Sequence, residues 1–134
     1  MITALDSSVL WAIVKQEAGH ELWLETLAEA ASEGSLVVSP VVFAELAPSA
    51  GSEARVTAYL SELGITYVPI SPVAAYLAGT TFQRYRKAGG PRQHLVPDFL
   101  IAAHAQTHAH RLAAIDRGYV REWFPDLRLL EIHH

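Results

Sequence analysis

Four acidic residues in this chain stand within or beside apolar segments, where an unpaired carboxylate is costly to bury. They are Asp6 after Ile-Thr-Ala-Leu, Glu45 in Phe-Ala-Glu-Leu, Asp98 before Phe-Leu-Ile-Ala-Ala, and Asp116 after Leu-Ala-Ala-Ile. Hard divalent cations such as Mg²⁺ prefer oxygen ligands of this kind. If the fold brings the four side chains together, they predict a metal site.

Such a cluster implies phosphodiester chemistry. Neighbouring carboxylates repel one another, and a bound Mg²⁺ or Mn²⁺ relieves that repulsion while lowering the pKa of a bound water. The implied reaction is in-line hydrolysis of a phosphodiester by metal-bound water. The hydroxyls of Ser7 and Ser8 could hold a ligand water or a phosphate oxygen. Taken singly, each acid is equally well explained as a helix cap or an ion-pair partner.

Apolar patterning predicts the elements that must position these acids. The predicted strands are 1–5, 35–38, 65–70, 111–115 and 127–131. Helices are predicted after Asp6 with Ser7 or Ser8 as the N-cap, over 20–32, in a short segment from Pro40 that carries Glu45, and over 52–63, 72–87 and 97–108.

Strands that alternate with helices favour a parallel sheet covered on both faces, in one domain spanning residues 1–134. In such sheets, sites form beyond the carboxyl ends of the strands. Asp6 and Asp116 follow strands, Glu45 lies on the helix after the second strand, and Asp98 lies in the first turn of a helix. All four acids can therefore converge at one end of the sheet.

Composition limits the classes of protein. The chain has 134 residues, of which 51% are hydrophobic and 18% charged, so a folded domain is expected rather than a disordered one. No apolar run is long enough to cross a membrane, no signal peptide is evident, and there is no cysteine. We expect a soluble, cytoplasmic protein without disulfides or thiolate metal sites; His133 and His134 end the chain.

The net charge of −4 hides an asymmetry, because residues 1–62 carry −7 and residues 63–134 carry +3. Four basic side chains gather in one segment that contains no acid: Arg84, Arg86, Lys87 and Arg92. Such a patch can bind phosphates even on an acidic protein. A solvated helix end followed by a loop explains the segment equally well.

Three other patterns favour ordinary structural roles. His104 and His108 have the spacing of paired zinc ligands, but no glutamate follows His104 and no cysteine completes a site. Gly89–Pro91 lacks the Lys-Ser/Thr of a phosphate-binding loop. Trp11 and Trp23 could line a groove for a partner helix, although tryptophans at helical spacing are more often core residues.

Together the motifs resemble those of PIN-domain nucleases. Asp6-Ser-Ser-Val-Leu resembles the opening of that family, and Ala44-Glu-Leu its second acidic position. Asp98-Phe-Leu-Ile-Ala-Ala-His-Ala resembles the third acidic position, and Leu112-Ala-Ala-Ile-Asp-Arg the strand and acid of the fourth. The size and spacing are most similar to the VapC-type toxins of toxin–antitoxin pairs, and the resemblance covers nearly the whole chain.

The resemblance implies an α/β three-layer sandwich in which helices flank a parallel sheet of about five strands. It implies an RNA endonuclease that uses Mg²⁺ or Mn²⁺, forms a homodimer and is inhibited by a small antitoxin reaching into the acidic pocket. Asp6, Glu45, Asp98 and Asp116 would form the catalytic site. Asp6 and Asp98 would be the main metal ligands, with Glu45 and Asp116 acting through water. The resemblance also makes Arg84 a basic position that touches RNA or antitoxin.

One residue departs from the family pattern. Many members have threonine or serine two residues before the fourth acid, where this chain has Ala114. This departure leaves open a second hypothesis, a catalytically weak PIN-like module that binds RNA or protein. A phosphotransfer domain with Asp6 as its nucleophile is a third hypothesis, which is disfavoured because no second acid follows Asp6 closely.

Overall fold

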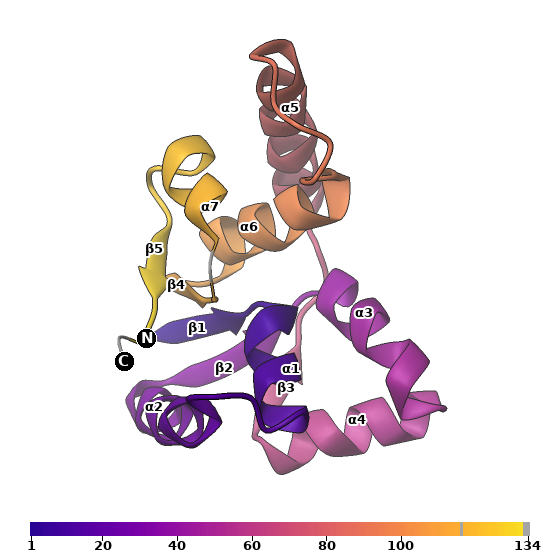
Figure 1. The fold of residues 1–134 in the computed structure, drawn as a ribbon, viewed down its shortest axis with the longest axis vertical. Helices are drawn as coiled ribbons and strands as arrows, with labels where there is room; N and C mark the ends of the chain where they lie inside the picture. The colour runs from indigo at the N-terminus through magenta and orange to yellow at the C-terminus, as the bar shows by residue number, and fades with distance from the viewer. Residues whose placement is uncertain (116, 133–134) are drawn as a thin grey trace.

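The computed structural model describes residues 1–115 and 117–132, and within those ranges the chain forms a single five-stranded sheet with helices around it (Figure 1). The strands are β1 (Ile2–Leu5), β2 (Ser35–Val38), β3 (Ile65–Tyr67), β4 (Arg111–Ala113) and β5 (Arg128–Leu130). The helices are α1 (Ser7–Val14), α2 (His20–Glu33), α3 (Pro40–Ala50), α4 (Glu53–Glu62), α5 (Pro72–Lys87), α6 (Val96–His108) and α7 (Gly118–Trp123).

The sheet has the strand order β3-β2-β1-β4-β5, and every neighbouring pair is parallel. β1 is the central strand, and Ala4 and Leu5 are almost fully buried there. The chain adds strands on one side of β1 up to β3 and then crosses to the other side for β4. Parallel sheets commonly place their sites beyond the carboxyl ends of the strands at such a reversal of strand order, which here lies at β1.

The helices divide according to the strands they cover. α2 packs on β2 and α4 on β3, whereas α6 packs on β1 and β4. Figure 1 shows α6 and α7 near β4 and β5, with α5 packed on α6 and its far end projecting away from the sheet. None of the helices in the described ranges combines the length and apolarity that a membrane crossing requires.

The predicted α/β fold with a parallel sheet of five strands is confirmed. Two local predictions are wrong. The N-cap of α1 is Asp6, which accepts a hydrogen bond from Ser8 N, rather than either serine. The six-residue helix α7 was not predicted, because it is stabilised mainly by the burial of Tyr119 and Val120 rather than by a local sequence signal.

The histidine pair of α6 has a structural role. His104 is 1% exposed, and its Nε2 donates to the carbonyl oxygen of Val68 at 2.8 Å. His108 Nε2 accepts a hydrogen bond from Ser71 N at 3.2 Å. Both contacts tie α6 to the segment between β3 and α5. Because these hydrogen bonds already engage both Nε2 atoms, the spacing that suggested zinc ligands is explained by packing.

We expect protonation of His104 at low pH to destabilise the folded protein. Burial lowers the pKa of His104 from 6.5, and the nearby His108 lowers it further, against the raising effect of the Val68 hydrogen bond. As the pH falls, the unfolded chain therefore takes up this proton at a higher pH than the folded protein does. The contribution of neutral His104 to the free energy of unfolding is fully present above about pH 6.5 and is lost as the pH falls below that value. Urea unfolding of wild type and His104→Gln at several pH values should show a shallower decline for the variant.

His20→Gln provides the matched control, because His20 lies at the exposed start of α2, away from the α6 contacts. It should retain the wild-type pH dependence. If His104→Gln also retains it, His104 is not the titrating group.

Candidate active site

Three of the four predicted acids are brought to one place from three different elements. Asp6 follows β1, Glu45 lies on α3, and Asp98 lies in the first turn of α6. Arg117 contacts two of them, with Nε 2.8 Å from Asp6 Oδ2 and a terminal nitrogen 3.9 Å from Asp98 Oδ1. Glu45 is close enough to Asp6, Asp98 and Arg117 for all three charges to affect its pKa.

Asp6 is the most deeply buried of these acids, with 1% of its surface exposed. Its Oδ2 atom accepts hydrogen bonds from Ser8 N at 3.3 Å, from the Ser8 hydroxyl and from Arg117 Nε. Its Oδ1 atom is buried and has no hydrogen-bond partner among the described residues. A buried carboxylate oxygen without a partner is unfavourable unless another ligand meets it, and a cation fits that place.

Ser39 and Pro40 determine where the helix that carries Glu45 begins. Ser39 Oγ caps α3 by accepting from Val42 N at 3.3 Å, and Pro40 occupies the first turn. Burial raises the pKa of Glu45, and the charges of Asp6 and Asp98 raise it further. The Ser7 hydroxyl and Arg117 oppose this rise by favouring the charged form. A cation in the site would act in the same direction as Arg117.

Asp98 is held by its own helix terminus. Its Oδ2 accepts a hydrogen bond from Leu95 N at 3.0 Å, which fixes the carboxylate against the first turn of α6. The carbonyl oxygen of Asp98 accepts a hydrogen bond from the Tyr119 hydroxyl at 3.2 Å. Burial raises the pKa of Tyr119, so the phenol stays neutral and remains a donor. α7, which carries Tyr119, thus supports the third acid.

The fourth predicted acid, Asp116, lies outside the described residues, and its place in the site stays a prediction. Its neighbours are described. Ala114 is 1% exposed, and its amide donates to the carbonyl oxygen of Leu130 at 3.3 Å. Ile115 N donates to the Ser8 hydroxyl at 3.1 Å. Residues 114 and 115 are therefore anchored to β5 and to the serine beside Asp6.

Arg117 is a site residue that the sequence analysis missed. Burial alone would lower its pKa, but the charges of Asp6 and Asp98 and the hydrogen bond to Asp6 outweigh burial and raise it. The guanidinium therefore stays charged among the carboxylates. The available sequence signal was a single arginine directly after the fourth acid, at the carboxyl end of a strand.

The predicted basic segment is placed at the projecting end of α5 and in the loop that follows it. Arg84 donates to Thr81 Oγ1 at 3.2 Å, and Arg86 donates to the carbonyl oxygen of Gly90 at 3.3 Å. Lys87 and Arg92 belong to the same exposed part of the chain. Figure 1 shows this end of α5 directed away from the sheet, and Tyr85 in the same turn packs against Phe99, the residue after Asp98. Their role in binding stays a prediction.

The chemistry of the described acids fits a hard divalent cation. The donors are carboxylate oxygens, and Asp6 Oδ1 is a buried acceptor that the described residues leave unpaired. In residues 1–115 and 117–132, however, no group of three His, Cys, Asp or Glu side chains is close enough to form a complete metal-binding set. With the acids arranged in this way, Arg117 supplies the positive charge between Asp6 and Asp98.

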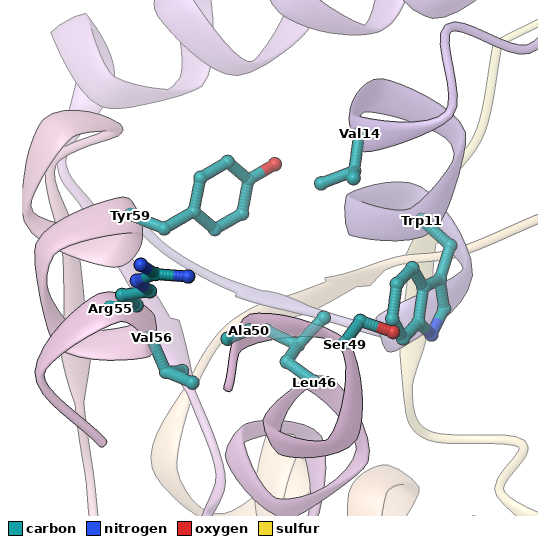
Figure 2. Close-up of a pocket in the computed structure, with 8 residues that line it drawn as sticks. All are labelled: Trp11, Val14, Leu46, Ser49, Ala50, Arg55, Val56 and Tyr59. Carbon is teal, nitrogen blue, oxygen red and sulfur yellow. The ribbon is translucent and has the colours of Figure 1, made fainter. Parts of the chain in front are cut away.

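A second feature is an apolar groove between α1, α3 and α4, with a cavity of about 230 Å³ (Figure 2). Eight residues line it: Trp11, Val14, Leu46, Ser49, Ala50, Arg55, Val56 and Tyr59. The hydroxyl of Tyr59 is buried in the groove, has no hydrogen-bond partner among the described residues, and has its pKa raised by burial. Of the two tryptophans considered for a groove, Trp11 lines this one and Trp23 is a core residue.

Comparison with known proteins agrees with this architecture. Residues 3–121 match the family model of the PIN domain. No curated protein sequence gives a significant match.

Among solved structures, VapBC-1 from nontypeable Haemophilus influenzae has a TM-score of 0.73 at 22% identity, with 98% of each chain covered. VapBC2 from Rickettsia felis, bound to a DNA fragment from its promoter, has a TM-score of 0.70 at 22% identity, again with 98% of each chain covered. A toxin–antitoxin complex from Klebsiella pneumoniae has a TM-score of 0.68 at 19% identity, covering 97% of this chain and 99% of that one. At these identities the likeness establishes the fold.

We expect Glu45→Gln to stabilise the metal-free protein. Because folding raises the pKa of Glu45, the native state holds this proton more tightly than the unfolded chain, and ionisation of Glu45 reduces stability as the pH rises above about 4.5. A neutral amide removes that penalty, so the free energy of unfolding at neutral pH should be higher than that of wild type. Urea unfolding in chelator measures it. The exposed Glu29→Gln is the control, and a destabilised Glu45→Gln would contradict the electrostatic picture.

Proposed function

Because the chain belongs to the PIN-domain family, we propose that it is a metal-dependent endoribonuclease and the toxin of a toxin–antitoxin pair. The observation that carries this proposal is the convergence of Asp6, Glu45 and Asp98 at the carboxyl end of the central strand. The chain would act as one PIN domain in the cytoplasm, where its RNA substrate and antitoxin would meet it. The family resemblance adds a homodimer, which sedimentation at several concentrations tests.

The chain's own groups would prepare the site for phosphodiester hydrolysis. When bound, Mg²⁺ or Mn²⁺ would supply charge to stabilise the phosphate and would lower the pKa of a water. Asp6 and Asp98 are the proposed direct ligands, and Glu45 and Asp116 are proposed to act through water. Glu45, whose pKa burial raises, is suited to hold or accept a proton near the attacking water. Ser7 faces Glu45 and favours its charged form.

A second candidate function rests on one observation. Ala114 is a buried methyl group where many family members have a hydroxyl, so no side-chain hydrogen bond at that position can orient a water or a substrate. In this reading the chain is a PIN-like module that binds RNA or protein with little catalysis. The basic residues Arg84, Arg86, Lys87 and Arg92 would then serve binding alone.

Cleavage of pooled small RNA separates the two functions. Wild type with Mn²⁺ or Mg²⁺ should cut RNA, while Asp6→Asn and Asp98→Asn should reduce the rate by roughly 100-fold or more, because each removes a proposed ligand. Glu53→Gln, an acid at the start of α4, is the matched control and should cut like wild type. Binding of RNA by wild type without metal-dependent cutting would favour the binding module. Equal cutting by all variants would place the activity elsewhere.

We propose that the apolar groove between α1, α3 and α4 receives the antitoxin. Two of the similar structures are VapBC complexes and a third is described as a toxin–antitoxin complex, which supports a small protein partner. The groove offers an apolar surface, and the buried Tyr59 hydroxyl lacks a partner in the free chain. An antitoxin segment that supplies a hydrogen bond to Tyr59 would satisfy that hydroxyl on binding.

Tyr59→Phe tests this surface. In the free protein it should leave the free energy of unfolding unchanged or slightly higher, because the lost hydroxyl had no partner. In complex with the cognate antitoxin it should weaken binding by about tenfold, as measured by calorimetry. Tyr76→Phe, on the exposed side of α5, is the matched control. Unchanged affinity for Tyr59→Phe would remove this hydroxyl from the interface.

A further inference from the structure

We propose that Arg117 is a positioning residue that, together with Ser8, holds one oxygen of Asp6 so that the other is the single atom Asp6 offers to the metal. This inference rests on the proposed metal-dependent function. Arg117 would orient the first ligand without being a ligand itself.

The two oxygens of Asp6 have opposite surroundings. Oδ2 accepts three hydrogen bonds, two from Ser8 and one from Arg117. Oδ1 accepts none from the described residues, although it is buried. A carboxylate oxygen has room for about two strong hydrogen bonds, so Oδ2 is saturated by the protein itself. The free oxygen is therefore the only one available to an incoming ligand.

The guanidinium geometry supports positioning rather than simple charge neutralisation. Arg117 places Nε on Asp6 at 2.8 Å and a different nitrogen 3.9 Å from Asp98 Oδ1. Because a guanidinium is planar and rigid, these two contacts restrict how the two carboxylates lie relative to each other. The Arg117 side chain is only 23% exposed, so its position is restricted by packing as well as by charge.

Ser8 completes the arrangement from the other side. Its hydroxyl donates to Asp6 Oδ2 and accepts a hydrogen bond from Ile115 N at 3.1 Å. This chain of hydrogen bonds connects the loop after β4 to the first acid. Hydrogen-bond partners of metal ligands typically change metal affinity or activity by 10- to 100-fold when they are removed. We therefore expect both Arg117 and Ser8 to affect metal binding without touching the metal.

The test is Mn²⁺ affinity without RNA, measured by electron paramagnetic resonance of the free ion. Arg117→Lys keeps the charge but cannot make the forked contact, so it should weaken Mn²⁺ binding by about tenfold. Ser8→Ala should weaken it several-fold, and Ser8→Thr, which keeps the hydroxyl, should restore it. Arg121→Lys, whose parent residue pairs with Glu131 at the surface, and Ser32→Ala on exposed α2 are matched controls and should bind like wild type.

The outcomes distinguish the two proposals. Wild-type affinity in both Arg117→Lys and Ser8→Ala would overturn the positioning role. Tighter binding by Arg117→Lys would also overturn it, because Arg117 would then be a competitor for the metal. If wild type itself binds no Mn²⁺, the proposed metal-dependent function fails before this inference is reached. Circular dichroism of each variant establishes that affinity is compared between folded proteins.

Discussion

A carboxylate buried at the end of the central strand imposes the main constraint on this structure. Asp6 must follow β1 directly to cap α1, and this position leaves it 1% exposed. Ser8, two residues further along, and Arg117 satisfy one of its oxygens, and Arg117 comes from the segment after β4, which pairs with β1. The register of β1 against β4 therefore decides whether Arg117 can reach the first acid.

The third acid, Asp98, depends on supports that come from elsewhere in the fold. α6 is anchored at its start by the Tyr119 hydroxyl and further along by His104, which ties it to the end of β3. Phe99, one residue after Asp98, packs against Tyr119 and Phe124. Because aromatic packing fixes this part of α6, Asp98 is held where Arg117 can approach it. The placement of Asp98 is thus set largely by the packing of α6 and α7.

Acidic, basic and apolar groups form three features of this structure. The acids come together beyond β1, four basic residues lie at the end of α5 and in the loop after it, and the apolar groove lies between α1, α3 and α4 (Figure 2). The unpaired oxygen of Asp6 belongs to the acidic site, and the unpaired hydroxyl of Tyr59 belongs to a residue that lines the groove. In the proposed function a cation meets the first and a protein partner meets the second, so the unpaired groups mark two distinct surfaces.

The sequence by itself determined the fold class. Apolar runs and the alternation of strand and helix patterns are local signals, and together they predict a parallel sheet. It also predicted Asp6, Glu45 and Asp98 as acids at one end of that sheet. Three features were not predictable in this way: the contact of Arg117 with Asp6, the different surroundings of the two oxygens of Asp6, and the short helix α7. They arise from contacts between residues as far apart as 6 and 117, and hydrophobic periodicity carries no information about such distant pairs. Only the tertiary structure, by pairing β1 with β4, decided which groups meet.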